Sequence, residues 1–251
     1  MFLPVTQRGL VAVTPAGEPA WLTAAPTAAE GATGLRVKVG ADLWAAEVAD
    51  DAPLAAGAVH PVAIAHAPFV ARAVALLRNR QIHRYHPTTG EKLGYTEGNI
   101  VGRTPEGREV FPRLDPAVIG VVTHGQPGSP EETLLLGRNA RRNSFYSLPA
   151  GYVDVGETLE EAFAREILEE TGRRVRDMRY WGSQPWPASG SLMVGFWGAT
   201  DDVHPVSHTD EELEEVRWFT RAELAELDSA QLARRGAIAH RMIMEWLHGG
   251  A

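Results

Sequence analysis

Residues 158–172 carry the pattern that most constrains the fold of this chain. Thr158 and Glu161 have the spacing of a capping box at a helix start, and Gly172 is a natural helix stop. Between them, four apolar residues recur at helical spacing: Leu159, Ala162, Phe163 and Ile167. The sequence therefore predicts an amphipathic helix over 158–171 whose apolar stripe packs against another element of the core.

The opposite face of this helix carries three carboxylates. Glu166, Glu169 and Glu170 stand at positions i, i+3 and i+4, which places their side chains on one face. Like charges at this spacing repel by about 0.2–0.5 kcal/mol per pair in an isolated helix. Mg²⁺, which prefers oxygen ligands and bridges carboxylates to phosphates, would neutralise them. A solvated acidic face without a metal is the alternative that the helix alone leaves open.

The helix lies inside a longer pattern that begins at Gly151 and reads G-x5-E-x7-REILEETG. This pattern resembles the box of the Nudix hydrolases, G-x5-E-x7-REUxEExGU with U an aliphatic residue, at every position but the last. There Arg173 replaces the aliphatic residue. Because this position follows the helix end, we expect a difference in packing and unchanged metal chemistry.

The resemblance implies a metal site on the helix and assigns roles to its residues. It implies roughly two or three Mg²⁺ or Mn²⁺ ions. Their ligands would be one backbone carbonyl and four carboxylates: Ala150, Glu166, Glu169, Glu170 and Glu212. For Glu212, a surface acidic run over 211–215 is the alternative. The sequence leaves open which carboxylate accepts a proton from the attacking water.

Two further residues of the box, Arg165 and Glu157, are assigned to the catalytic site by the same resemblance. Arg165 would orient Glu157 or Glu169, and the loop over 151–157 would bring its backbone close to a diphosphate. An ordinary surface ion pair between Arg165 and Glu169, at i and i+4, is the alternative for the arginine.

A second pattern, SQPWPASGS over 183–191, resembles the SQPWPFPxS array of the NADH pyrophosphatase branch of the family. The resemblance assigns substrate contacts to five of its residues: Gln184, Pro185, Trp186, Pro187 and Ser191. Ala188 and Ser189 stand where the family has Phe and Pro. One aromatic wall and some loop rigidity are therefore missing, and substrate preference is less sharply defined.

Three residues outside the array are also assigned to substrate by position in the resemblance. Phe111 and Tyr152 would supply aromatic surfaces for a base, where stacking contributes roughly 1–3 kcal/mol. Ala239, in the segment AIA over 237–239, would belong to a C-terminal substrate segment. For either aromatic residue taken alone, ordinary core packing is the more common role.

The segment over 81–113 resembles the zinc ribbon of the family in its turns but not in its ligands. Gly90 and Gly107 persist from the two C-x-x-C-G turns. The four ligand positions read His86, Thr89, Arg103 and Glu106, which cannot supply the four N or S ligands of structural zinc. We predict no structural zinc and a ribbon held by packing. A stray metal bound through His83 and His86 is the alternative.

The whole chain is predicted to be α+β, with three parts. Residues 1–80 would form a small N-terminal α+β domain, 81–113 the zinc-free ribbon-like connector, and 114–251 the catalytic domain. The resemblance makes the catalytic domain a Nudix α/β/α sandwich.

Apolar patterning gives the expected elements of these parts. Short strands are expected in the N-terminal domain at 10–13, 35–39 and 59–65, followed by a helix over 69–80. In the catalytic domain, strands are expected at 117–123, 133–136, 192–197 and 216–219, and a second helix over 231–247.

Composition limits the partners and the compartment. The net charge of -8 argues against general attraction to nucleic-acid or membrane surfaces, so phosphate substrates would need metal ions. The chain has no cysteine, which excludes disulfides and thiol chemistry and fits a reducing compartment. Neither a leader peptide nor a membrane span is recognisable. We expect a cytoplasmic protein, and the resemblance implies a homodimer.

Together the resemblances predict metal-dependent hydrolysis of the diphosphate linkage of NAD(H) to NMN(H) and AMP. Metal-activated water would attack one phosphorus, with no covalent intermediate. NAD-capped RNA is a related substrate that the resemblance permits. One alternative is hydrolysis of another nucleoside diphosphate derivative such as ADP-ribose, favoured by the altered array. A catalytically silent nucleotide-binding sensor of the same fold is the other.

Overall fold

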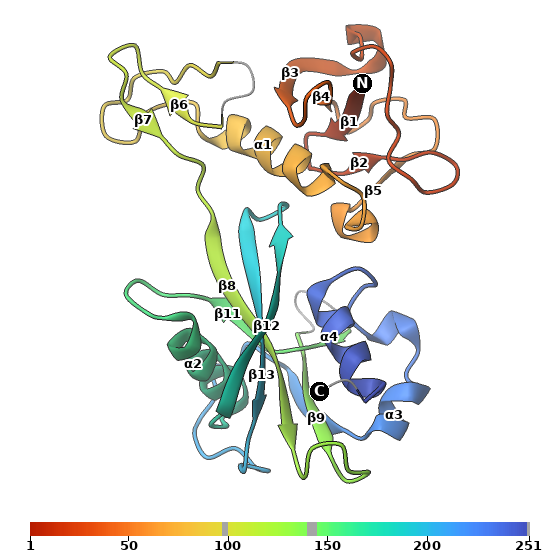
Figure 1. Ribbon diagram of the computed structural model, residues 1–251, viewed down its shortest axis with the longest axis vertical. Coiled ribbons are helices and arrows are strands. Elements are labelled where there is room, and N and C mark those ends of the chain that lie inside the picture. The colour runs from red at the N-terminus through yellow and green to blue at the C-terminus, as the bar shows by residue number, and fades with distance from the viewer. Residues whose placement is uncertain (97–99, 140–144, 250–251) are drawn as a thin grey trace. The chain divides into compact units, whose positions relative to one another are not determined.

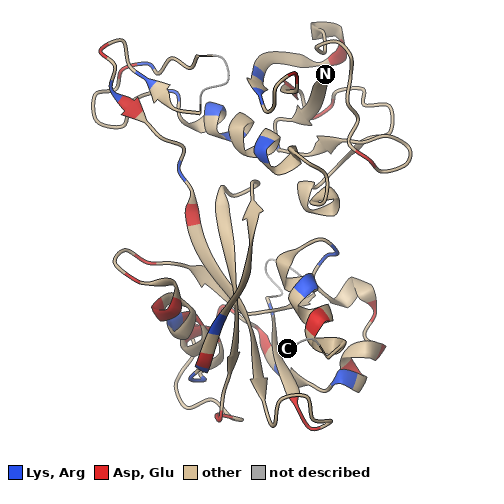
Figure 2. Ribbon diagram, viewed as in Figure 1, with Lys and Arg blue, Asp and Glu red and all other residues tan. Residues whose placement is uncertain are grey.

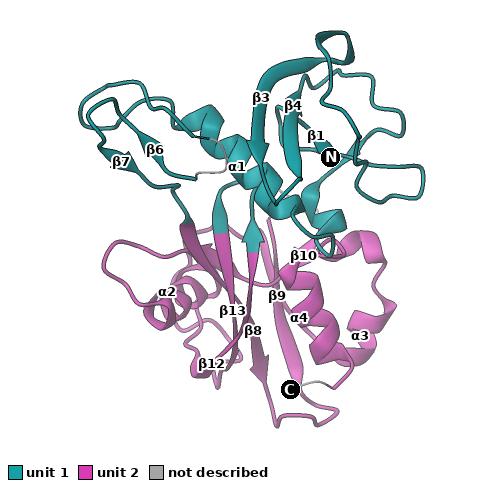
Figure 3. Ribbon diagram, turned by 45° about the horizontal axis from the view of Figure 1, so that its top comes forward, with its two compact units in different colours: residues 1–114, 185–191 teal, residues 115–184, 192–251 magenta. Residues whose placement is uncertain are grey.

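The computed structural model describes residues 1–96, 100–139 and 145–249 (Figure 1). The chain divides into two units (Figure 3). Unit 1 comprises Met1–Leu114 and Pro185–Ser191, and unit 2 comprises Asp115–Gln184 and Leu192–Ala251. Unit 1 therefore includes the central part of the array, which the sequence places in the catalytic domain. Both units contain helices and strands, which confirms the predicted α+β class.

Unit 1 is built on a five-stranded sheet with the order β3-β4-β1-β2-β5. Its strands are β1 (Phe2–Thr6), β2 (Val11–Ala12), β3 (Ala32–Lys38), β4 (Trp44–Val48) and β5 (Ala58–Val59). The helix α1 (Val70–Ile82) follows them, as predicted, and buries Ala73, Val74 and Leu77 in the core of the unit. Short 3-10 helices occupy Ala28–Glu30 and Pro61–Ile64.

The strand expected over 59–65 is largely wrong. Only Val59 lies in a strand, and a 3-10 helix begins at Pro61. Proline has no N–H for a sheet ladder, and its fixed φ suits the first turn of a helix. The sequence pattern also missed β1 and β4, the parallel pair at the middle of the sheet.

The connector contains a turn at each of its two glycines, and a side chain closes each turn. Gly90 and Gly107 have left-handed backbone, with φ of 72° and 86°. In the first turn, His86 Nδ1 accepts the N–H groups of Thr88 and Thr89, both at 3.2 Å. The short strands β6 (Gly102–Arg103) and β7 (Glu109–Val110) flank the second turn and pair with each other.

The second turn repeats this arrangement with a hydroxyl in place of the imidazole. Thr104 Oγ1 accepts the N–H of Arg108 at 3.2 Å, and Gly107 N–H donates to the Thr104 carbonyl at 2.9 Å. The two turns are joined by an ion pair of 3.6 Å between Arg108 Nη1 and Glu91 Oε2. Local hydrogen bonds therefore satisfy the polar groups of both turns.

Unit 2 contains a seven-stranded sheet with the order β10-β9-β8-β13-β12, where β11 pairs with β8 and β14 with β9. Its strands are β8 (Asp115–His124), β9 (Thr133–Arg138), β10 (Tyr146–Ser147), β11 (Ala150–Tyr152), β12 (Arg176–Trp186), β13 (Ser191–Ala199) and β14 (Glu215–Phe219). Its helices are α2 (Leu159–Thr171), α3 (Arg221–Glu226), the 3-10 helix Ser229–Gln231 and α4 (Ile238–Leu247). The four strands and the first helix predicted for this region are present.

Helices cover both faces of the sheet in unit 2 (Figure 1). Along β8, Val118 and Val122 pack with Phe163 of α2, whereas Ile119 packs with Met242 of α4. Alternate residues of a strand point to opposite faces, so one strand contributes to two apolar layers. The predicted sandwich is confirmed. In the part of the chain that the structure describes, no helix is long and apolar enough to cross a bilayer.

The second predicted helix begins later than the sequence pattern suggests. It was expected over 231–247, and α4 begins at Ile238. Gly236 has a φ of 87°, a left-handed conformation that interrupts a helix and that glycine adopts without strain. The strand β12 was not predicted at all, because most of its side chains are exposed and show no apolar alternation.

Candidate functional site

Local interactions set the start, the end and the buried face of α2. Thr158 Oγ1 accepts the N–H of Glu161 at 3.2 Å, and Glu161 Oε2 accepts the N–H of Thr158 at 2.8 Å. At the other end, Gly172 N–H donates to the Leu168 carbonyl at 2.9 Å. The apolar stripe of α2 is buried against the sheet, and the remaining positions of the helix hold its acidic and basic residues, which form its charged face (Figure 2).

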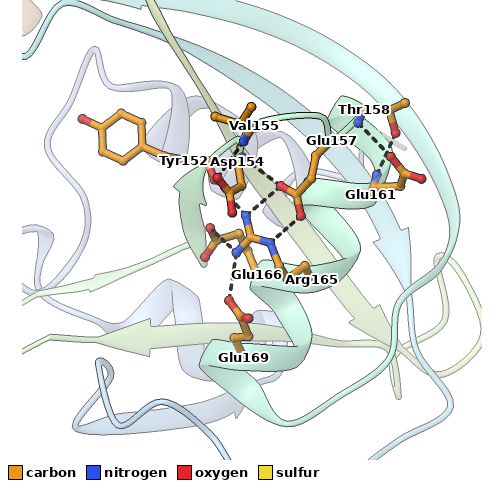
Figure 4. A network of polar contacts seen from close by, with 9 residues as sticks. All are labelled: Tyr152, Asp154, Val155, Glu157, Thr158, Glu161, Arg165, Glu166 and Glu169. Atoms are coloured by element: carbon orange, nitrogen blue, oxygen red, sulfur yellow. Dashed lines mark hydrogen bonds and ion pairs between the residues drawn. The ribbon is translucent and has the colours of Figure 1, made fainter.

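The guanidinium of Arg165 lies at the centre of a network on that face (Figure 4). It donates to both carboxylate oxygens of Glu157, at 2.6 and 2.9 Å, and to the Tyr152 carbonyl at 2.9 Å. It also donates to Glu166 at 2.9 Å and to Glu169 at 2.8 Å. Hydrogen bonds from Arg165 lower the pKa of the Glu157 carboxyl to about 2. Arg165 therefore contacts both partners that the sequence left open, and Glu166 as well.

Glu170 is the buried carboxyl of the face, with 5% of its surface exposed. Its Oε2 accepts the N–H of Ala150 at 3.1 Å. Burial raises the pKa of the Glu170 carboxyl to about 8, and the nearby carboxylates of Glu166, Glu212 and Asp210 also raise it. Carboxylates from α2 and from the segment before β14 thus both act on the Glu170 carboxyl.

Asp210 is a member of this cluster that the sequence did not single out. Its backbone N–H donates to the Glu169 carbonyl at 2.9 Å, and its Oδ1 accepts the N–H of Glu212 at 2.9 Å. Asp210 opens the acidic run in which only Glu212 was proposed as a ligand. The run itself was the available signal, but which of its members face Glu170 depends on how the segment packs against α2.

The backbone of β11 approaches the Glu166 carboxylate closely. A Cβ added at Gly151 would overlap that carboxylate, so any other residue here would displace the Glu166 side chain. Gly151 pairs with Val118 of β8, and this pairing fixes the register of β11 in the sheet. The first glycine of the box therefore allows the backbone of β11 to lie close to the Glu166 carboxylate.

The donors of this region match a hard divalent cation in kind. They are all oxygens, and their mutual repulsion raises the pKa of Glu166 and Glu170 in addition to the effect of burial. In the part of the chain that the structure describes, no three His, Asp or Glu side chains already converge as a metal cluster. Arg165 contacts two of the proposed ligands, Glu166 and Glu169, in this arrangement.

Gln184 of the array is buried, with 7% of its surface exposed, and both ends of its amide are bonded within unit 2. Its Nε2 donates to the Gly236 carbonyl at 2.7 Å, and its Oε1 accepts the N–H of Ile238 at 2.7 Å. These bonds hold the backbone directly before α4. Ala239 follows in the first turn of α4, where its side chain belongs to the buried core.

Residues 185–191 of the array lie in unit 1. The ring of Trp186 is 5.7 Å from that of His60, centroid to centroid, and Ser189 Oγ is 2.7 Å from Ser191 Oγ. Pro185 is exposed at the end of β12.

Ala188 faces the N-terminal domain. With Pro187 it lines a pocket whose apolar wall is formed by Val5, Val74 and Leu77 of β1 and α1. The aromatic ring that the family carries at this position would therefore meet the N-terminal domain, a surrounding that the sequence could not show.

Phe111 and Tyr152 are both exposed, at 64% and 55% of their surface. Phe111 belongs to unit 1 and Tyr152 to unit 2. Ordinary core packing, the alternative role for either residue, is excluded by this exposure. Both rings are accessible for stacking.

The NUDIX domain family matches residues 113–247, which is more than half of the chain and includes the whole carboxylate cluster. The chain belongs to the Nudix family. Among relatives of this Nudix protein, the NAD-capped RNA hydrolase NudC of Mycobacterium bovis is 44% identical over 138 residues, 55% of this chain and 42% of the relative. The enzyme of the same name from Deinococcus radiodurans is 37% identical over 166 residues, covering 65% and 58%. The chain thus spans about half the length of these relatives.

Solved structures agree with the fold. The crystal structure of a NUDIX hydrolase from Nitrosomonas europaea matches this Nudix protein with a TM-score of 0.52. The match covers 66% of this chain and 90% of that chain at 22% identity, and supports the fold alone.

Proposed function

We propose that this Nudix protein hydrolyses the diphosphate linkage of NAD(H) to NMN(H) and AMP, and cleaves NAD-capped RNA at the same bond. The observation that carries the proposal is the carboxylate face of α2, where Arg165 binds Glu166 and Glu169 and the buried Glu170 carboxyl accepts the Ala150 N–H. The array over 183–191 and the relatives named as NAD-capped RNA hydrolases support the choice of substrate.

The proposed metal ligands are the carboxylates of Glu166, Glu169, Glu170 and Glu212 with the backbone carbonyl of Ala150. When bound, Mg²⁺ or Mn²⁺ would supply activated water and neutralise the phosphate oxygens. Glu170 accepts the Ala150 N–H, so one side chain ties the helix to the backbone that contributes the carbonyl ligand. The ligands from β11 and α2 are thereby held together.

Arg165 and Glu157 orient this set and do not need to touch the reacting atoms. The two-pronged pair between them holds the guanidinium, which in turn holds Glu166 and Glu169. Arg165 also bonds the Tyr152 carbonyl at the end of β11. The diphosphate would meet the backbone of the loop that follows.

Base recognition is proposed for the exposed rings of Phe111 and Tyr152. The array residues Pro185, Trp186, Pro187 and Ser191 are proposed to shape the substrate site. Gln184 and Ala239 act on it through the backbone at the start of α4, because the Gln184 amide is fully bonded there.

We further propose a cytoplasmic homodimer, as the family resemblance implies. Sedimentation at micromolar concentration should give twice the mass of one chain. A monomer that turned over NADH at full rate would contradict the proposed dimer but not the proposed hydrolysis.

A second candidate substrate is ADP-ribose or a similar nucleoside diphosphate derivative. The observation that favours it is the array itself, in which Ala188 and Ser189 replace the aromatic residue and the proline of the family. Both substrates carry the same diphosphate, so the cluster on α2 would serve either. A silent nucleotide sensor is the candidate from another class.

Product analysis tests the function. The purified protein is incubated with NADH and Mg²⁺, and the products are separated by chromatography, with Glu170→Gln as the control. Equal amounts of NMNH and AMP, absent from the control, are expected. Turnover of ADP-ribose alone would favour the second candidate, and no turnover of any dinucleotide with Mg²⁺ or Mn²⁺ would favour the sensor.

A further inference from the structure

Arg173 occupies the single position at which this chain departs from the Nudix box, and its side chain is buried with 6% exposed. Its Nη1 donates to the Thr171 carbonyl at 2.7 Å. Its Nε and Nη2 both donate to the Val203 carbonyl, at 3.2 and 3.0 Å. The aliphatic residue that the box calls for at this position could form none of these bonds.

The Val203 carbonyl accepts hydrogen bonds from two different side chains. Besides the two bonds from Arg173, it accepts the indole N–H of Trp218 at 3.0 Å. The guanidinium of Arg173 also lies 5.4 Å from the centroid of the Trp218 ring. One carbonyl is thus held by a helix terminus and by a strand, since Trp218 belongs to β14.

Val203 begins the segment that carries two carboxylates of the cluster. From there the backbone runs along the C-terminal end of α2, where Val206 N–H donates to the Gly172 carbonyl at 2.7 Å and Asp210 N–H to the Glu169 carbonyl at 2.9 Å. Asp210 Oδ1 in turn accepts the N–H of Glu212 at 2.9 Å, so these bonds hold both acidic residues beside the end of α2 that carries Glu169 and Glu170.

We propose that Arg173 is a positioning residue of the metal site, which holds the segment over 203–212 on the end of α2 so that Asp210 and Glu212 lie beside Glu169 and Glu170. The inference rests on the proposed function only in that the cluster binds a divalent cation. Arg173 fixes the start of the segment with hydrogen bonds to Val203 and Thr171, and its positive charge lies near the negative end of the helix dipole.

A purely structural role predicts a different response to substitution. Arg173→Leu restores the aliphatic type of the family and removes the hydrogen bonds to two carbonyls, so the melting temperature should fall in either case. In a purely structural role, the folded variant binds Mn²⁺ as the wild type does. If Arg173 positions the segment, the folded variant also binds Mn²⁺ more weakly, and the amides of the segment over 203–212 exchange faster.

The test uses the whole protein without substrate. Free Mn²⁺ is measured by electron paramagnetic resonance in titrations of the wild type, Arg173→Leu and Arg173→Lys, together with melting temperature and hydrogen exchange at the Val206 and Asp210 amides. We expect about a tenfold weaker Mn²⁺ affinity, faster exchange and a lower melting temperature in Arg173→Leu, with partial rescue by Lys.

Two further variants keep the test decisive. Arg8→Leu is the control, because Arg8 is exposed and pairs with Asp50 in unit 1, and its Mn²⁺ affinity should match the wild type. If Arg173→Leu does not fold, Trp218→Phe takes its place in the test. This variant keeps an aromatic ring but removes the donor to Val203, and it should weaken Mn²⁺ binding by about twofold. Wild-type affinity in all variants would overturn the inference alone. A wild type that binds no Mn²⁺ would overturn the proposed function as well.

Discussion

The carboxylate face of α2 and the turns of the connector both correspond to places where the family resemblance puts a metal, and their polar groups are satisfied in opposite ways. On α2, burial raises the pKa of the Glu170 carboxyl to about 8, and nearby carboxylates add to this effect. In the connector, His86 and Thr104 accept hydrogen bonds from the backbone of their own turns. Complementary donors and acceptors can replace a metal, whereas like charges cannot satisfy one another and favour a cation.

The largest expected effect of this difference is on catalysis. Glu170→Gln keeps an acceptor for the Ala150 N–H but removes a charged ligand, so kcat should fall by roughly two orders of magnitude or more. Glu169→Gln should behave alike. Steady-state kinetics with NADH measure kcat, and circular dichroism shows whether each variant is folded. Near-normal turnover in both folded variants would rule out the metal-helix assignment.

The next effect is on stability in the presence of Mg²⁺ or Mn²⁺. A cation that binds only the folded protein at about 100 times its Kd adds about 2.7 kcal/mol to the free energy of unfolding. Wild-type protein should melt at a higher temperature with the cation, and Glu170→Gln should not respond. An equal response in both proteins would place the cation elsewhere.

A third cluster, around Gln184, should behave like the connector and depend on hydrogen bonds alone. Gln184→Leu leaves the Gly236 carbonyl and the Ile238 N–H without partners, so the free energy of unfolding should fall by about 1–3 kcal/mol, with or without Mg²⁺. Ser183→Ala, at the exposed neighbour, is the control. Denaturant titration measures the loss, and an unchanged stability would show that these bonds contribute nothing.

A substitution in the connector should lower the free energy of unfolding only slightly, and this effect should not depend on metal. His86→Ala removes a side-chain acceptor that resembles a helix cap, which is worth about 0.5–2 kcal/mol. His66→Ala, at an exposed histidine, should be neutral. Elemental analysis should find no stoichiometric zinc, and EDTA should leave the melting temperature of Glu170→Gln unchanged. One zinc per chain that is lost with His83 or His86 would reverse the comparison.

The smallest effect concerns Ala188. If the ring missing at this position reads the nicotinamide side, Ala188→Phe should shift the preference for NADH over ADP-ribose by roughly two- to tenfold, since an aromatic contact is worth about 0.5–1.5 kcal/mol. The pocket beside Val5 and Val74 offers the ring a second partner. Values of kcat/KM for both substrates, measured together with the melting temperature, distinguish a ring that contacts the substrate from a ring that packs in this pocket. A changed melting temperature with equal kinetics for both substrates would assign the ring to packing.

Local patterns made the core of the site predictable. The capping box, the apolar stripe and the spacing of the three carboxylates lie within one helix, so sequence neighbours determine them. The start of α4 was missed because Gln184, which lies 52 residues before Gly236 and 54 before Ile238, bonds the backbone there. Asp210 and the surroundings of Ala188 depend in the same way on packing between distant segments.

The most direct test of the comparison is to locate the bound cation. Mn²⁺ binding is titrated by electron paramagnetic resonance for the wild type, Glu170→Gln and His86→Ala at equal protein concentration. If α2 holds the cation, the wild type and His86→Ala bind Mn²⁺ alike and Glu170→Gln loses most of the affinity. Binding that survives in Glu170→Gln and disappears in His86→Ala would contradict the assignment.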